Sequence, residues 1–243
     1  MDDGFTLLEL SIVLVIIGLI IGGITVGQDL VKSAETNSVV TDVGKYESAL
    51  NTFRLKYNAV PGDMDNATDY WGEAHATPAT CITTASTGTE TCNGDGDGRV
   101  KPDNNTGGES YRVWHHLANA ELIKGSFNGI RTAPDYYVAD VNVPSAPFNG
   151  AWHIYGFNEG FFTDSGANTL GFFAASSDML QNKVTAFEPA YAVVVDTKLD
   201  DGMAESGNVR SEGCGTNLIE DGDAGASYDL TSTTGCGMIF NLE

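Results

Sequence analysis

The sequence predicts an α+β protein in which one long N-terminal helix carries a loop-rich C-terminal domain with a small antiparallel sheet. Three observations predict this fold. Residues 5–26 are apolar apart from one charge, an amphipathic helical pattern continues to residue 57, and short runs of aromatic and β-branched residues follow among turns. The chain has 243 residues, so a single domain with an appendage fits its length better than two full domains.

The charge of the chain is strongly acidic and lies mostly in the second part. With 12 Lys and Arg against 33 Asp and Glu, the formal net charge is −21, and residues 61–243 alone carry −18. Such a surface repels phosphate backbones and anionic membrane surfaces, which disfavours both as partners. Hydrophobic residues make up 42%, which excludes a wholly disordered acidic chain.

The apolar run from Phe5 to Val26 is long enough to cross a hydrocarbon layer of about 30 Å as a helix. A secretory signal peptide has a shorter apolar core of about 7–15 residues after a basic stretch, and no base precedes this run. A plain membrane anchor leaves Glu9 unexplained, since a carboxylate in lipid costs about 2.5–3.5 kcal/mol and usually marks a function. We therefore predict a membrane span that contains a functional carboxylate.

The helical pattern continues beyond the apolar run. No helix breaker occurs between Leu30 and Pro61, and apolar residues step by three or four along one side. A helix from Phe5 to Tyr57 is about 80 Å long at 1.5 Å per residue, too long for a domain of this size to bury, so its first half must protrude. The predicted buried stripe consists of Val39, Val43, Tyr46, Leu50, Phe53 and Tyr57.

The stretch Gly4-Phe5-Thr6-Leu7-Leu8-Glu9, followed by the apolar run, resembles the prepilin cleavage and methylation motif of type IV pilins and type II secretion pseudopilins. The resemblance implies that prepilin peptidase cuts after Gly4 and that Phe5 becomes an N-methylated terminus. Glu9 would pair with the terminal amine of a neighbouring subunit, which gives the buried carboxylate a partner. The implied organisation is a leader at 1–4, a helix at 5–57 with its membrane or filament-core part at 5–26, and an extracellular α+β domain at 58–243.

The same resemblance implies a structural subunit of an extracellular helical filament, a pilus or a secretion pseudopilus. Its partners would be copies of itself, other pilins and prepilin peptidase, and it would sit in the inner membrane before it enters an extracellular or periplasmic filament. The alternative is a membrane-tethered binding or enzymatic domain with a similar anchor. A tether needs neither Glu9 nor the long stripe, so we favour the filament subunit and expect no enzymatic activity.

The start of the chain departs from the family pattern. Family leaders are usually basic, whereas Met1-Asp2-Asp3 is acidic, and Lys32 beyond the run opposes the positive-inside rule. Gly18 stands where many family members have a glycine that weakens the helix. Val26 replaces a common proline, so local melting of the helix would depend on Gly22-Gly23.

The C-terminal part predicts mixed helices and strands. The segment Glu109–Ile123 has helical spacing and a stop at Gly125, and Asn66–Trp71 predicts one helical turn. The segment Pro189–Leu199 has features of both a strand and a helix, and we favour a helix. Elements of this part, such as the turn at residues 61–63, also look like bacterial prepilin-type proteins. The predicted strands are Tyr136–Val143, Ala151–Phe157 and Thr169–Ala175.

The four cysteines allow three disulfide connectivities, and an exported chain should be oxidised. Their spacing, without histidines nearby, disfavours zinc. Cys81–Cys92 and Cys214–Cys236 are expected, because each pair closes a short loop that lacks other restraint. The second pair also resembles the C-terminal disulfide loop of many pilins.

The stretch Asn93-Gly-Asp95-Gly-Asp97-Gly98 matches the opening of a calcium loop, in which oxygens at positions 1, 3 and 5 converge before a glycine turn. The backbone carbonyl of Arg99 would be the ligand at position 7. Asn104 stands where a glutamate is expected at position 12, so Asp103 or Glu109 would have to substitute. The alternative interpretation is a flexible acidic turn.

A second carboxylate cluster, Asp196, Asp200 and Asp201, precedes Gly202 and is a weaker candidate for calcium or a solvated turn. No phosphate loop or catalytic triad motif occurs in the sequence. The adjacent histidines His115 and His116 lie on the predicted helix, and one of them is expected to be half-buried beside Trp114.

Overall fold

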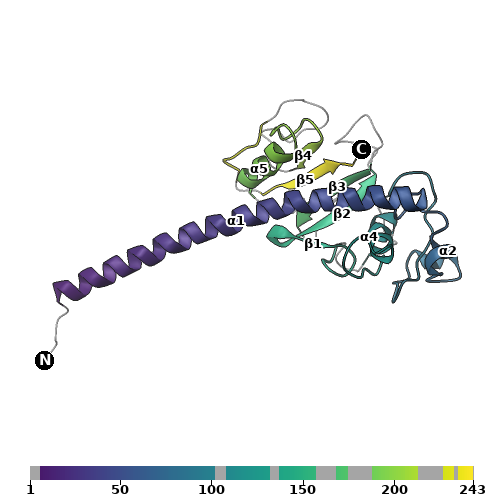
Figure 1. The fold of residues 1–243 in the computed structure, drawn as a ribbon, viewed down its shortest axis with the longest axis horizontal. Helices are drawn as coiled ribbons and strands as arrows, with labels where there is room; N and C mark the ends of the chain where they lie inside the picture. The colour runs from purple at the N-terminus through teal and green to yellow at the C-terminus, as the bar shows by residue number, and fades with distance from the viewer. Residues whose placement is uncertain are drawn as a thin grey trace.

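One long helix runs along the molecule, and a domain packs against only its second half (Figure 1). The start of this helix lies far from the domain, and strand β5 (Gly237–Asn241) near the end of the chain lies within it (Figure 1). The α+β class with a protruding helix and a small antiparallel sheet is confirmed. The computed structural model describes residues 6–101, 108–131, 137–156, 168–174, 188–212, 227–232 and 235–242.

The long helix, α1, spans Leu7–Tyr57 without interruption. Thr6 caps its N-terminus, and Asn58 ends it in the left-handed conformation at φ 52°. Asparagine tolerates this conformation better than most residues, which explains the stop before Pro61. The predicted stripe is confirmed, since its first five members are buried and Tyr57 packs against the core.

The sheet has five antiparallel strands in the order β1-β2-β3-β5-β4. Its centre is apolar: Trp152 pairs with Phe172, and Leu170 pairs with Phe240 across the next strand. Two of these strands match predicted segments within one residue. The strands are β1 (Ser145–Ala146), β2 (Gly150–Gly156), β3 (Asn168–Ala174), β4 (Val209–Glu212) and β5 (Gly237–Asn241).

The second half of α1 packs on this sheet through aromatic side chains. The Tyr46 ring lies 5.6 Å from Trp152 and 5.0 Å from Trp114, both in edge-to-face contact. Such pairs contribute about 0.5–1.5 kcal/mol beyond the area that they bury. The core therefore joins α1, the sheet and the helix that carries Trp114.

The shorter helices are α2 (Ala67–Trp71), α3 (Pro78–Cys81), α4 (Glu109–Asn119), α5 (Pro189–Leu199) and the 3₁₀ turn η1 (Pro147–Asn149). The prediction of a helix at Pro189–Leu199 is confirmed. The helix at Glu109 is shorter than predicted, because Glu121 adopts φ 61° and the Leu122 N–H bonds back to the Leu117 carbonyl. Its stop is thus made by Glu121 and not by Gly125.

The predicted strand Tyr136–Val143 is wrong over the residues that the structure describes, which begin at Tyr137. Asp140 adopts φ 61°, and its N–H donates to the Val143 carbonyl (2.8 Å), so the chain turns back on itself. The buried Asn142 amide holds the turn, since its oxygen accepts from the Val138 N–H (2.7 Å). A side chain that bonds its own backbone competes with a sheet ladder.

Candidate functional site: the protruding half of the first helix

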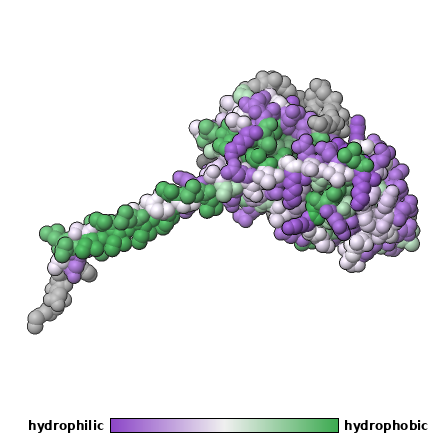
Figure 2. Space-filling view, viewed as in Figure 1, coloured by the Kyte–Doolittle hydropathy of each residue, from purple (hydrophilic) through white to green (hydrophobic). Residues whose placement is uncertain are grey.

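The first half of α1 is an unpacked apolar rod. Its large apolar side chains from Leu7 to Val31 are all exposed, from 46% at Ile17 to 88% at Leu7. Figure 2 shows this half as a nearly continuous hydrophobic surface beside a mainly hydrophilic domain. It extends for about 37 Å at 1.5 Å per residue. Within the described residues, α1 is the one helix long and apolar enough to cross a membrane.

Glu9 has a defined place at the start of this rod. Its Oε2 accepts the Thr6 N–H (2.9 Å) and the Thr6 hydroxyl (2.8 Å), and the Glu9 N–H donates to Thr6 Oγ1 (3.2 Å). This reciprocal capping box satisfies donors that a helix start would otherwise leave free. The sequence prediction gave Glu9 a role in assembly but missed Thr6, although a threonine three residues before a glutamate is the usual signal for this cap.

The glycines of the rod leave its surface open. A Cβ added at Gly18, Gly22 or Gly23 would meet nothing within 4 Å. The helix nevertheless continues through Gly22-Gly23, where the Thr25 hydroxyl donates to the Gly22 carbonyl (3.0 Å). In the isolated chain this segment is therefore helical, and any melting would require a different environment.

Residues 2–25 match a known family, the prokaryotic N-terminal methylation motif. The chain carries the signature of type IV pilins and pseudopilins. The matched segment covers Glu9, Thr6 and most of the rod. It also covers the predicted processing residues Gly4 and Phe5, which lie outside the described residues, so cleavage and methylation stay predictions. No curated protein and no solved structure matches this pilin-like chain.

The acidic loop of the domain lies near the far end of α1. One carboxylate oxygen each from Asp63, Asp95 and Asp97 lie within 4.8 Å of one another, as a cation site requires. Asp63 follows the Pro61-Gly62 turn and was not among the predicted ligands. Its oxygens accept the Gly98 N–H (2.8 Å) and the Asp97 N–H (3.1 Å), which brings a distant carboxylate to the loop.

The other predicted members of the calcium loop are arranged differently. Asn93 uses its side-chain oxygen to accept the Thr68 N–H at the start of α2 (2.8 Å). Glu109 accepts the N–H groups of Asp95 (3.1 Å) and Lys101 (2.9 Å). The Arg99 N–H donates to Asp97 (3.0 Å). Asn104 and Asp103 lie outside the described residues.

A lysine already supplies positive charge to this loop. The Lys101 ammonium contacts Asp95 and lies 2.7 Å from Asp97 Oδ2, and these contacts raise its pKa. Burial raises the pKa of Asp63 to about 6, with a further contribution from its neighbour Asp95. The loop therefore holds more carboxylates than one lysine neutralises. Calcium binding here stays a prediction that has to include displacement of Lys101.

The second acidic cluster braces the turn after α5. Asp196 is buried and accepts the Tyr228 hydroxyl (2.7 Å) and the Gly202 N–H (3.1 Å), and burial raises its pKa to about 6. Asp201 accepts the Ser206 hydroxyl (2.6 Å). Asp200 accepts the Val209 N–H (3.1 Å). All three carboxylates have partners within the domain. One oxygen from each also lies within 4.8 Å of the others, so calcium binding here stays a prediction, as at the first cluster.

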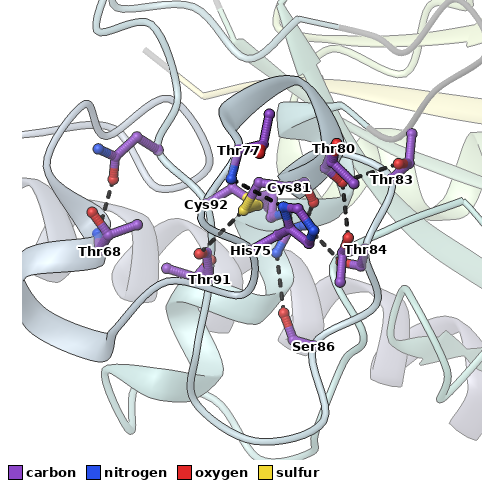
Figure 3. Close-up of a disulfide and its surroundings, with 12 residues drawn as sticks. Thr68, His75, Thr77, Thr80, Cys81, Thr83, Thr84, Ser86, Thr91 and Cys92 are labelled. Carbon is purple, nitrogen blue, oxygen red and sulfur yellow. Dashed lines mark hydrogen bonds between the residues drawn. A yellow bond between two sulfur atoms is a disulfide. The ribbon is translucent and has the colours of Figure 1, made fainter.

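The Cys81–Cys92 disulfide is present, with 5.8 Å between the Cα atoms. Figure 3 shows it among Thr83, Thr84 and Thr91 of the loop that it closes and residues before that loop, which include His75, Thr77 and Thr80. The buried Arg112 guanidinium donates to the carbonyls of Cys81 (2.9 Å) and Thr84 (3.1 Å), so α4 holds the same loop from inside. Cys236 is also disulfide-bonded, and its predicted partner Cys214 lies outside the described residues.

Both adjacent histidines are buried, so the expectation of a half-buried histidine is wrong. His116 Nδ1 accepts the Gly62 N–H (2.9 Å), which leaves Nε2 to donate to the Thr91 hydroxyl (2.9 Å). This is the neutral tautomer. Burial, followed by the charges of His115 and Arg112, lowers the pKa of His116 well below its usual value. The histidine thus links α4 to two loops as a structural group.

Proposed function

We propose that this chain is a structural subunit of an extracellular helical filament. The first half of α1 would pack against the same segment of neighbouring subunits, and the acidic domains would lie outside. The observation that carries this proposal is the exposed apolar rod, which is continuous with the half of α1 that packs on the domain. Neither a pilus nor a secretion pseudopilus is favoured by the features described above.

The free energy of hydrophobic burial supports this role. Each large aliphatic side chain contributes about 1.5–3 kcal/mol when it is fully removed from water. A rod with apolar residues on all sides has to be covered on all sides. A membrane meets this demand in the precursor, and several neighbouring rods meet it in a filament.

The methylation motif supports the remaining steps of the proposal. Prepilin peptidase would cut between Gly4 and Phe5, and the new terminus would be methylated. The precursor would wait in the inner membrane and then leave it for the filament. The domain is proposed to have no enzymatic role, and the buried groups His116, Asp63 and Asp196 are engaged in structural hydrogen bonds.

The test of this proposal removes Glu9 and leaves the rod intact. Glu9→Ala should abolish or cripple filament yield, because the carboxylate is the proposed partner of a neighbour's terminal amine. It should leave membrane insertion at least as favourable, since it removes a costly charge. Glu47→Ala is the matched control, because Glu47 lies exposed on the buried half of the same helix.

The measurements are the filament yield after shearing and the membrane-bound precursor level. Normal yield from Glu9→Ala would contradict the proposed docking role. Mass spectrometry of sheared wild-type filaments should find Phe5 as the N-terminus, with the added mass of one methyl group. An intact Met1 in filaments would remove the basis of the processing step.

A further inference from the structure

Five residues form a surface patch at the end of the domain where α1 leaves it, and we call them the base patch: Lys32, Phe148, Glu188, Tyr191 and Val194. The Lys32 ammonium lies 5.0 Å from the centre of the Tyr191 ring and 3.4 Å from Glu188 Oε1. The Phe148 ring stacks on Tyr191 with 5.6 Å between centres. The two aromatic rings are half-buried, and Val194 is 40% exposed.

The chain itself places this patch next to the membrane. Lys32 follows the end of the apolar run at Val26 by six residues, or about 9 Å along the helix. The polar headgroup layer extends about 5–7 Å beyond the hydrocarbon on each side, so the Lys32 backbone lies at its outer edge. The long Lys32 side chain extends back toward the layer, because helical side chains point toward the N-terminus of their helix. Figure 1 shows α5 and the β1–β2 turn at the end of the domain that faces the protruding half of α1. With the rod in a bilayer, these elements lie at the end of the described domain that faces the lipid headgroups.

The chemistry of the patch fits that layer. Tyrosine rings and lysine side chains are typical of the membrane–water interface, because each has an apolar body and a polar end. The Phe148 ring adds apolar surface beside the Tyr191 ring. Lys32 is paired with Glu188, so the pair is neutral, in contrast to the strongly acidic domain. A zwitterionic phospholipid surface is therefore favoured over an anionic one.

The backbone at Phe148 adopts an energetically unfavourable conformation. Phe148 and Asn149 have φ values of 56° and 57°, a left-handed conformation that is rare for a bulky residue such as phenylalanine. A strained residue persists only where the surrounding structure holds it, and such residues cluster at functional positions. In this domain the strained turn presents an aromatic ring beside Tyr191.

We propose that the base patch lies in the interfacial layer of a zwitterionic phospholipid bilayer while the chain is anchored by its rod. The domain is then held against the membrane surface and does not move freely on the helix. This inference depends on the membrane span and not on filament formation. It can fail while the filament proposal stands, and the reverse also holds.

The test uses tryptophan fluorescence of the full chain, one copy per phosphatidylcholine nanodisc, with and without brominated acyl chains as quencher. Phe148→Trp and Val194→Trp report on the patch from two elements, so one of them suffices if the other fails to fold. Tyr70→Trp is the matched control, because Tyr70 is 56% exposed on α2 at the opposite end of the domain (Figure 1). The wild-type signal from the native tryptophans is subtracted in each case.

The proposal expects a blue shift and strong quenching for the two patch reporters and neither for Tyr70→Trp. Equal, weak quenching at all three positions would overturn it. A blue shift of the patch reporters that occurs only when several copies share a larger vesicle would also overturn it. A second copy of the chain, and not the lipid, would then cover the base patch. Folding of each variant is checked by its near-ultraviolet circular dichroism.

Discussion

The two halves of α1 belong to one uninterrupted helix but have opposite surroundings. From Leu7 to Val31 the large apolar side chains are exposed, whereas in the second half Val39, Tyr46 and Phe53 are buried. The first half is apolar on every side, and the second half is apolar along one stripe. A stripe can be satisfied by one sheet, but a fully apolar surface needs neighbours all around. The comparison shows that the domain stabilises only half of its own longest element.

The two ends of α1 also differ in the residues that surround them. The start is closed by Thr6 and Glu9, whose bonds lie within one turn of the helix. The other end is surrounded by the acidic loop, His116 and an aromatic group that contains Phe53 and Trp71. Changes at the second end should therefore unfold the domain, and changes in the first half should not.

The largest expected difference comes from truncating one side chain in each half. Phe53→Ala should cost about 3–5 kcal/mol of domain stability, because it empties a fully buried site between Trp71 and His116. Leu14→Ala should leave domain stability unchanged, since Leu14 is 69% exposed in the rod. Thermal unfolding of the full chain in detergent, followed by near-ultraviolet circular dichroism, measures both. Similar losses in the two variants would show that the halves are not energetically separate.

Calcium is expected to stabilise only the domain at the second end of α1, by less than Phe53→Ala destabilises it. If it binds the loop of the folded state, a hundredfold excess over Kd should stabilise the domain by about 2.7 kcal/mol. Asp95→Asn with Asp97→Asn should remove that gain. The matched control is Glu47→Gln with Glu121→Gln, which removes two exposed charges elsewhere.

The calcium measurement compares melting with calcium, with chelator and with sodium at equal ionic strength, because general screening responds to any salt. An equal calcium response in the wild type and the Asp95/Asp97 variant would identify the loop as an acidic turn. Lys101→Met should strengthen the response, since calcium then displaces no ammonium from Asp95 and Asp97.

The smallest expected effect is a pH dependence at His116. Its folded pKa is depressed, so the unfolded chain binds the proton more readily and stability is lost as pH falls below about 6.5, by up to about 1.4 kcal/mol per pH unit. The carboxyls of Asp63 and Asp196, with folded pKa values raised to about 6, act in the opposite direction as pH falls from about 6 to 4.

The variant His116→Gln isolates this contribution, because both carboxyls remain in it. The free energy of unfolding between pH 7 and 5 should fall less steeply in the variant than in the wild type. If the free energy of unfolding depends on pH identically in both proteins, His116 binds no additional proton on unfolding. Helix content of the rod in detergent should be unaffected across this range.

Local sequence patterns were sufficient for the elements whose cause is local. The α1 stripe, the helix at Pro189–Leu199 and strands β2 and β3 follow from periodicity and residue type. The pattern did not predict β4, because Val209–Glu212 is short and polar, nor β5, whose apolar residues do not alternate. Strand Tyr136–Val143 failed because Asp140 and Asn142 form a turn that its β-branched neighbours conceal.

By itself the sequence determined the apolar rod, the methylation motif and the disulfide Cys81–Cys92, since each depends on residues close together in the chain. Only the tertiary structure decided that Asp63 joins Asp95 and Asp97, and that Lys101 lies between those carboxylates. It also decided that Lys32, Phe148 and Tyr191 meet at one end of the domain. These groups come from segments up to about 160 residues apart, and they meet because the sheet packs on α1. A pattern of neighbouring residues carries no information about contacts over that separation, so the sequence did not predict them.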